Sequence, residues 1–405
     1  MAFKKLLFCQ AHLHGGAGMA VHSVATSLSH FGHSVEILTE NSFVTSDITK
    51  RFNSIILKIR KFIFSLIYKQ VISDSSYEFK EVGFYSLSKI KTRKLLMNSM
   101  PDVIFIGSSS VFMDIEVVRD YCTKYEKKVV FIEADENVFT GGCHYVNNCV
   151  QYKSGCKQCP AVKKFYRYIP RRNFRVKESF LSLNPIIASL SPFDRSIFEG
   201  SLFRDQIDIE LQSLNYLSSQ DFDHYRLERD LRVKRNIQEL NVSFVCNNYN
   251  DQRKGIEDLI LIANAMFNIK VRFHLFGDTG PVMSRFNGIN EIINYGFIDK
   301  SILIKRMAEC DVFLNLTKQD KGPASLVIAL QLGIPVISYK VGMARFFMDK
   351  NDGFLIDKIG NYGQIMSKLN SVDFRSYKTV GKLMRDFYDE ERLKVVMENF
   401  NKIIC

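Results

Sequence analysis

The sequence predicts an α/β protein built from two doubly wound, Rossmann-like domains that face a cleft. Short apolar, β-branched strands alternate with helical segments, which is the pattern of a parallel sheet. Each half also contains a strand followed by a loop suited to an anion, glycine-rich in the first half and basic in the second. The length of 405 residues suits two domains of roughly 150–200 residues better than one core.

The composition is that of an ordinary globular protein, with 46% hydrophobic and 24% charged residues. The net charge of +12 and the pI near 9.1 predict an anionic partner, which could be nucleic acid, an anionic membrane surface or a phosphorylated substrate. We expect no secretory signal and no membrane span. The nine cysteines are therefore expected in a reducing cytosol, as thiols or metal ligands.

Residues 1–215 are expected to form the N-terminal domain. Its first strand, residues 3–9, leads into a loop at 10–19 where Gly15 and Gly16 let the backbone approach a ligand, before a helix that begins near Met19. A glycine-rich loop of this kind is equally typical of a tight turn without a ligand. The further expected strands are 34–39, 101–107, 128–134, 185–190 and 207–216.

Residues 51–73 mix apolar side chains with five embedded cations. A basic, apolar helix of this kind can lie in a bilayer interface. It can equally be a domain helix with a broad core face, and the pattern does not separate the two.

Four cysteines lie within seventeen residues, inside the expected insertion at 143–159: Cys143, Cys149, Cys156 and Cys159. They have the ligand count of a structural zinc site, and His144 is a substitute ligand. A reduced, metal-free loop and a disulfide pair remain alternatives.

Residues 216–240 are expected to be a linker, followed by the C-terminal domain at 241–385. A final helix at 386–405 is expected to pack back on the N-terminal domain. The strands expected in the second domain are 242–246, 271–277, 294–298, 310–316 and 335–339, with a helix at 323–332 before the last of them.

The stretch VSFVCNNYNDQRKG, residues 242–255, organises this second domain. It places Arg253 and Lys254 between a strand and a helix that follows Gly255. Two cations and free backbone amides at such a junction can bind a diphosphate, although a solvated basic turn would have the same sequence.

The chain resembles the family 4 (group 1) retaining glycosyltransferases of the two-domain GT-B fold, in the branch that builds colanic-acid-type bacterial surface polysaccharides. The resemblance spans nearly the whole chain. It rests on GGAG at 15–18, FTGGCHY…C…KSGCKQCP at 139–160, NDQRKG at 250–255 and DKGPASLVIALQLGIPVISY at 320–339.

The resemblance implies transfer of a sugar from a nucleotide-diphosphate donor to a growing or lipid-linked glycan, with retained configuration and no catalytic metal. Asp135, Arg253 and Lys254 would act in catalysis. The enzyme would be cytoplasmic and peripheral at the inner face of the cell membrane, docked on anionic lipid. No nucleic acid partner is expected, because no helix-turn-helix or stacking motif is present. The implied donor-binding residues are Gly15, Gly16, Asn248, Arg253, Lys254, Asp320, Pro323, Ala324 and Ser325.

The sequence departs from the family pattern at three positions. Ala134 replaces the histidine of a His-Asp pair, Ile328 replaces the second of two acids eight positions apart, and Met343 replaces the second glycine of a pair. Isoleucine cannot accept the hydrogen bonds of a donor ribose. The alternative hypothesis is therefore a catalytically inactive relative that acts as a binding or assembly partner.

Overall fold

The computed structural model describes two compact units. The described residues are 3–10, 15–39, 49–51, 62–63, 66–81, 89–107, 113–189, 195–210, 239–320, 324–342, 344–348, 352–371, 373–374 and 390–404. By contacts, the first unit is Met1–Ser213 with Leu393–Cys405, and the second is Leu214–Arg392. Of the expected linker, residues 216–238 lie outside the described residues, and 239–240 already belong to a strand.

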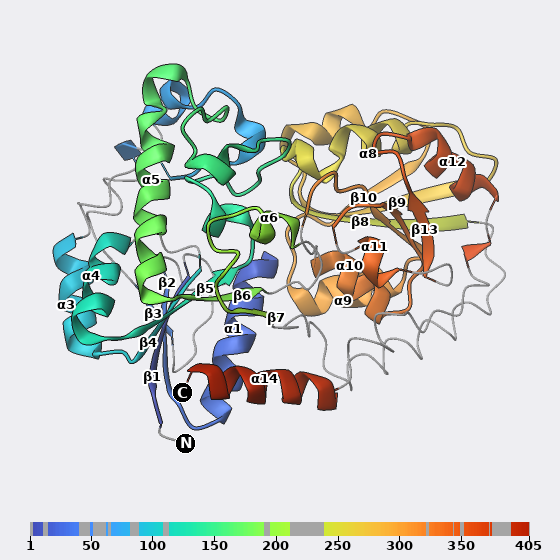
Figure 1. The fold of residues 1–405 in the computed structure, drawn as a ribbon. Helices are drawn as coiled ribbons and strands as arrows, with labels where there is room; N and C mark the ends of the chain where they lie inside the picture. Colours follow the sequence, from blue (N-terminus) through green and yellow to red (C-terminus); the bar gives the residue numbers. More distant parts are fainter. Residues whose placement is uncertain are drawn as a thin grey trace. The chain divides into compact units, whose positions relative to one another are not determined.

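The first unit contains a seven-stranded parallel sheet with the order β3-β2-β1-β4-β5-β6-β7 (Figure 1). Its central strands β1, β4, β5 and β6 are mainly apolar, as a sheet covered on both faces requires, whereas the edge strands β3 and β7 are polar. They are β1 (Lys5–Cys9), β2 (Ser34–Thr39), β3 (Thr49–Arg51), β4 (Val103–Ile106), β5 (Lys128–Glu133), β6 (Ile186–Ser189) and β7 (Asp208–Glu210).

Alternate residues of these strands feed two separate cores. Leu6 and Phe8 of β1 pack with helix α1 (Gly15–His30), whereas Leu7 and Cys9 pack with helix α4 (Ile115–Tyr125) on the opposite face. The remaining helices of this unit are α3 (Lys89–Ser99), α5 (Tyr168–Glu178) and α6 (Ser196–Glu199). The sheet is thus doubly wound.

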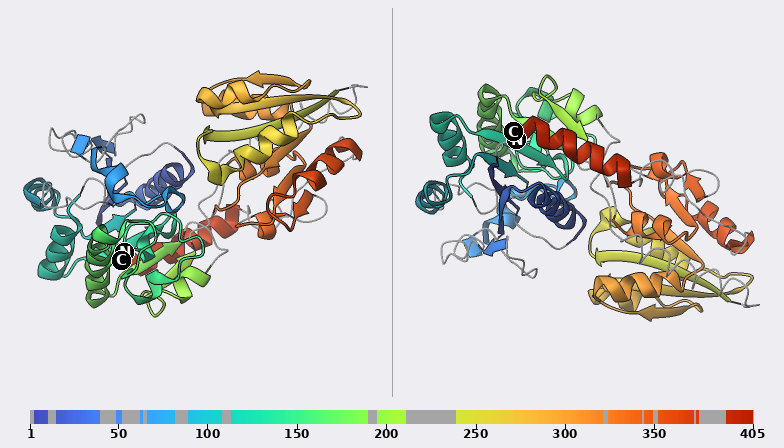
Figure 2. Two further views of the ribbon diagram at one scale, coloured as in Figure 1. Left: turned by 90° about the horizontal axis from the view of Figure 1, so that it is seen from above. Right: turned by 90° about the horizontal axis from the view of Figure 1, so that it is seen from below.

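The C-terminal helix α14 (Glu390–Ile404) completes the first core. Phe400 and Ile404 are fully buried against α1 and the sheet, and the Phe400 ring meets the edge of Phe105 at 6.0 Å between centroids. A buried hydrogen bond of 2.6 Å joins Asn401 to His33. Figure 2 shows this red helix along the first unit in both views.

The second unit repeats the topology with the six-stranded order β10-β9-β8-β11-β12-β13, again all parallel. Its elements are β8 (Glu239–Asn248), α8 (Ile256–Ala263), β9 (Lys270–Asp278), β10 (Glu291–Asn294), α9 (Lys300–Ala308), β11 (Val312–Asn315), α10 (Ala324–Gln331), β12 (Val336–Tyr339), α11 (Ala344–Phe347), β13 (Gly353–Ile356) and α12 (Tyr362–Ser371). The strand order reverses between β8 and β11, which makes this position the switch point of the sheet. In such sheets, ligands bind at the carboxyl ends of the strands beside the switch point.

Two expected elements are wrong in position. Helix α1 begins at Gly15 rather than near Met19, because small residues continue directly into its apolar face. The strand expected at 294–298 is β10 at Glu291–Asn294, since Gly296 adopts a positive φ of 65° that ends the strand.

We expect Phe400→Ala to destabilise the first unit by about 3–5 kcal/mol, since it leaves a cavity under a fully buried ring. Urea unfolding followed by circular dichroism measures this change. Val395→Ala on the same helix is the control, because Val395 is 53% exposed. Equal effects of the two substitutions would contradict the packing of α14 described above.

Candidate functional site

The basic loop of the second unit lies at the switch point of its sheet. β8 ends at Asn248, and a 3-10 turn, Gln252–Lys254, carries Arg253 and Lys254 before α8 begins. The neighbouring strand β11 ends at Asn315, and the loop after it carries Asp320. The carboxyl ends of two adjacent parallel strands therefore bring these side chains together.

Local hydrogen bonds fix the shape of the basic loop. Asp251 caps the turn by accepting from the amide of Arg253 at 3.1 Å, and Asn248 accepts from the amide of Asn250 at 2.8 Å. Gly255 follows with a φ of 76°, in the left-handed region. A Cβ at Gly255 would lie 2.1 Å from the carbonyl oxygen of Leu316, so only glycine allows this close approach to the loop after β11.

Both cations of the loop contact Asp320. The Lys254 ammonium forms an ion pair with the Asp320 carboxylate, and the Arg253 guanidinium lies 3.4 Å from the same oxygen. Arg253 also pairs with Asp251 at 2.8 Å and donates to the Gln319 carbonyl at 2.8 Å. The side chains of Arg253, Lys254 and Asp320 are only 14%, 21% and 13% exposed, so their attraction is little weakened by water.

The other implied donor-binding residues occupy helix starts or lie outside the described residues. Ala324 and Ser325 form the first turn of α10, directly after the loop that carries Asp320. Gly15 and Gly16 form the first turn of α1 in the first unit, rather than a loop before it. Pro323 lies outside the described residues.

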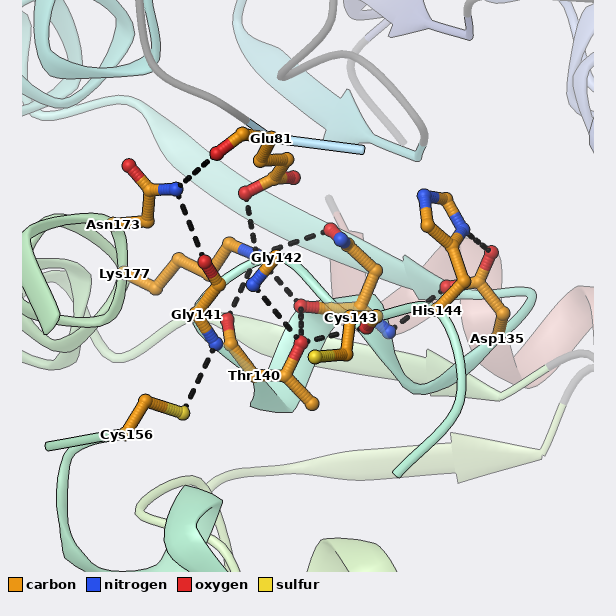
Figure 3. A network of polar contacts seen from close by, with 11 residues as sticks. Glu81, Asp135, Thr140, Gly141, Gly142, Cys143, His144, Cys156, Asn173 and Lys177 are labelled. Atoms are coloured by element: carbon orange, nitrogen blue, oxygen red, sulfur yellow. Dashed lines mark hydrogen bonds and ion pairs between the residues drawn. The ribbon is translucent and has the colours of Figure 1, made fainter. Parts of the chain in front are cut away.

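In the first unit, Asp135 follows β5 and forms a pair with His144. The Asp135 carboxylate lies 2.7 Å from Nδ1 of His144 and accepts from the amide of Asn137 at 2.8 Å (Figure 3). Burial by itself would raise the pKa of Asp135, but the adjacent imidazole and these hydrogen bonds outweigh it and lower the pKa. The Nε2 atom of His144 is buried and has no hydrogen-bond partner in the described part of the chain.

The loop between Asp135 and His144 is held by a buried lysine, Lys177, which the sequence does not reveal as a site residue. Lys177 is 4% exposed, pairs with Glu81 at 3.3 Å, and donates to the carbonyl oxygens of Asn137 at 2.6 Å and Thr140 at 3.0 Å. Asn173 of the same helix donates to the Gly141 carbonyl at 3.0 Å. The partners of Lys177 lie 37 to 96 positions away in the sequence. Their residue types form no recognisable motif, so the sequence alone does not identify them.

The two glycines of the TGGC segment are required by this packing. A Cβ at Gly141 would lie 2.2 Å from the Pro170 carbonyl oxygen of α5. Gly142 has a φ of 135°, and its Cβ would lie 2.8 Å from the Phe79 ring. The family-like motif is thus explained by the contact of the loop with α5 and with the strand-like residues before Glu81.

The four cysteines of the insertion are free thiols. A hydrogen bond links Cys143 and Cys159, raising the pKa of Cys143 and lowering that of Cys159, while Cys156 accepts from the Gly141 amide at 3.3 Å. Within the part of the chain that the structure describes, no group of three or more His, Cys, Asp or Glu side chains is placed to hold a metal ion. The structural zinc ion stays a prediction.

The two sheets and the basic switch-point loop together define a two-domain, Rossmann-like protein with two adjacent cations at the switch point of its second half. Residues 239–371 match the family model of glycosyl transferases group 1. The chain is 22% identical over 267 residues to WcaC of Escherichia coli K12, described as a colanic acid biosynthesis glycosyl transferase, covering 60% of this chain and 61% of that protein.

Two solved structures share the whole fold. Sucrose-phosphate synthase from Thermosynechococcus elongatus has a TM-score of 0.66 at 13% identity, covering 99% of both chains. Anabaena HepE, in complex with UDP-glucose, has a TM-score of 0.57 at 15% identity, covering 98% of this chain and 100% of its own. The predicted resemblance to group 1 glycosyltransferases is thus matched over residues 239–371, and the predicted GT-B fold is confirmed.

We expect Gly255→Ala to destabilise the second unit more than Gly360→Ala. Both glycines have a positive φ, 76° and 81°, so the backbone strain of about 1–2 kcal/mol is shared. Only Gly255 also meets a carbonyl oxygen, since nothing lies within 4 Å of a Cβ at Gly360. Urea midpoints of the two variants measure the difference, and equal midpoints would contradict the close approach at Leu316.

We expect Asp135→Asn to lower the free energy of unfolding at pH 7. The pKa of Asp135 is lowered from its ordinary value of 3.8, so the ionised carboxylate stabilises the folded state at pH values above 3.8. This stabilisation is lost as the pH falls through the lowered pKa. The difference in the free energy of unfolding between Asp135→Asn and the parent protein should therefore become smaller below about pH 4. Urea unfolding across pH 3–7 tests this, with Asp205→Asn as control because the Asp205 side chain is 83% exposed. A difference that stays constant with pH would contradict the Asp135 assignment.

Proposed function

We propose that this protein transfers a sugar from a nucleotide-diphosphate donor to a hydroxyl of a lipid-linked or growing glycan, with retained configuration, in bacterial surface polysaccharide assembly. The family match, the colanic acid relative and the UDP-glucose bound by HepE support this proposal. The observation that carries it is the convergence of Arg253 and Lys254 on one carboxylate at the switch point.

The chemistry follows from the charges of this loop. When the bond between the sugar and the diphosphate breaks, negative charge develops on the leaving phosphate oxygen. Arg253 and Lys254 would stabilise that charge as fixed donors, an effect of several kcal/mol per well-placed group. The amides of Ala324 and Ser325 at the start of α10 add partial positive charge beside them.

Asp320 occupies the position beside the two cations that we propose for the diphosphate. Its carboxylate contacts both cations in the structure, so the donor must displace it or share them. Asp320 would then be available to accept a hydrogen bond from a sugar hydroxyl, in keeping with the donor-binding role that the family resemblance implies for it.

The alternative is a catalytically inactive relative that keeps the fold for binding or assembly. The observation that favours it is Ile328, which is 4% exposed in α10 and offers no polar atom to a ribose. Release of nucleotide from a UDP- or GDP-sugar by the purified protein would contradict this alternative.

The proposal also locates the protein in the cytoplasm, at the inner face of the membrane, where lipid-linked acceptors are presented. Among the described residues, no helix is long and apolar enough to cross a membrane. The membrane association that we propose is peripheral.

We expect Lys254→Ala to weaken binding of UDP, GDP or inorganic pyrophosphate by at least about tenfold, since a charge-assisted hydrogen bond contributes about 1.5–3 kcal/mol. Asp320→Asn should tighten the same binding several-fold, because it removes the competing internal anion. Calorimetry measures both changes, and pyrophosphate makes the test independent of the base.

The matched control is Lys358→Ala, which removes an exposed cation of the same unit. It should leave the affinity unchanged. If the parent protein binds none of the three ligands, the donor-site proposal fails.

A further inference from the structure

We propose that the exposed face of α5, together with the turn before it, is the surface that docks the protein on an anionic lipid bilayer. This inference rests on the proposed function, because a lipid-linked acceptor requires the enzyme to reach a membrane. Residues 51–73, for which the sequence leaves a bilayer-interface helix and a core helix as alternatives, lie mostly outside the described residues.

The first observation is charge. Residues 151–177 contain nine cations and no Asp or Glu: Lys153, Lys157, Lys163, Lys164, Arg167, Arg171, Arg172, Arg175 and Lys177. Lys177 is buried and paired with Glu81, whereas Lys163, Lys164, Arg171 and Arg175 are exposed. A cluster of this size and sign is attracted to anionic headgroups.

The second observation is the arrangement of these cations on one helical face. Tyr168, Arg171, Arg172 and Arg175 follow the spacing i, i+3, i+4 and i+7, and all are exposed. The residues of the same helix that face the core, among them Phe174 and Val176, are buried. Arg172 pairs with Glu116 of α4 at 3.5 Å, and the exposed Glu178 follows Arg175 by three positions, so the net positive charge of this surface comes from Arg171 and Arg175 together with the lysines of the turn.

The third observation is the exposure of large aromatic side chains among these cations. Phe165 is 90% exposed and Tyr168 is 64% exposed. Phe165 lies three residues before Tyr168, in the 3-10 turn that leads straight into α5. Exposed Phe and Tyr between Lys and Arg side chains match the boundary between headgroups and acyl chains, where aromatic rings enter and cations meet phosphates.

The other basic segment without Asp or Glu, residues 51–73, contacts the chain next to this turn. The amide of Lys163 donates to the Val71 carbonyl at 2.9 Å, and its ammonium donates to the Lys69 carbonyl at 3.1 Å. In the described part of that segment, Phe62 and Leu66 are 64% and 58% exposed. Two stretches nearly a hundred residues apart in sequence thus meet, and both combine cations with exposed apolar groups.

Sedimentation with vesicles tests the inference. We expect the protein to bind vesicles of phosphatidylcholine with 30% phosphatidylglycerol, and to bind pure phosphatidylcholine at least about tenfold more weakly. The double variant Lys164→Gln with Arg171→Gln should lose about fivefold per cation. Phe165→Ser with Tyr168→Ser should weaken binding while leaving its dependence on salt unchanged.

The matched control is Lys305→Gln with Lys358→Gln, which removes two exposed cations from the second unit. It should bind vesicles as the parent does. Equal losses in the control and in the α5 variant would overturn the inference, because charge alone would then explain binding.

Two further outcomes would also overturn it. One is no binding to anionic vesicles, and the other is binding of single-stranded RNA through Lys164 and Arg171 with no vesicle binding. Calorimetry with UDP in the absence of lipid separates this inference from the proposed function. Intact nucleotide binding without vesicle binding rejects only the docking surface, whereas absent nucleotide binding rejects the donor site.

Discussion

The buried ammonium group of Lys177 is the interaction on which the loop after β5 depends. It contacts the Glu81 carboxylate and the carbonyl oxygens of Asn137 and Thr140, all within the interior of the first unit. Burying one charge is unfavourable unless every donor finds an acceptor, and losing one partner of a buried pair costs about 3–5 kcal/mol. The loop must therefore keep the course that supplies these oxygens.

That constraint reaches the candidate site through short steps. With Asn137 and Thr140 held, the turn between them places Asp135 at its start, where the carboxylate accepts the Asn137 amide. Thr140 accepts the Gly142 amide and donates to the Cys143 carbonyl, so the chain returns and His144 meets Asp135 (Figure 3). A structural ion pair thus determines the position of a polar pair at the carboxyl end of β5.

The cations of the second unit are held in a different way. Arg253 and Lys254 are partly exposed, and their shared partner Asp320 sits on a separate loop that follows another strand. Their side chains are 14% and 21% exposed, whereas those of Lys177 and Glu81 are 5% and 0% exposed. An anion from solution can therefore reach Arg253 and Lys254 more readily than Lys177. Burial separates structural cations from cations available to an anion.

The sequence predicted the fold well because the relevant signals are local. Apolar runs located β1, β2, β4, β5 and most strands of the second unit within a few residues. The family resemblance named Arg253, Lys254 and Asp320 as donor-binding residues, but their mutual contact became visible only in the structure, where two adjacent strands end side by side. The start of α1 was wrong because Gly15 and Gly16 are weak helix formers that tertiary packing overrides. Lys177 could not be identified, because its partner Glu81 lies 96 positions away and both resemble surface charges in sequence.

Two departures from the family pattern, Ala134 and Ile328, differ in what surrounds them in the structure. Ala134 is small and packs at the edge of the α1 core, so the strand end itself offers no imidazole. His144, brought back by the loop that Lys177 holds, places an imidazole against the neighbouring Asp135 instead. Its Nε2 has no partner among the residues that the structure describes, although a buried polar atom normally has one. Ile328 has no such replacement among its described neighbours on α10, where the buried residues are mainly apolar. Near the first departure an imidazole is thus present on a residue ten positions further on, whereas α10 carries no acidic side chain near the second.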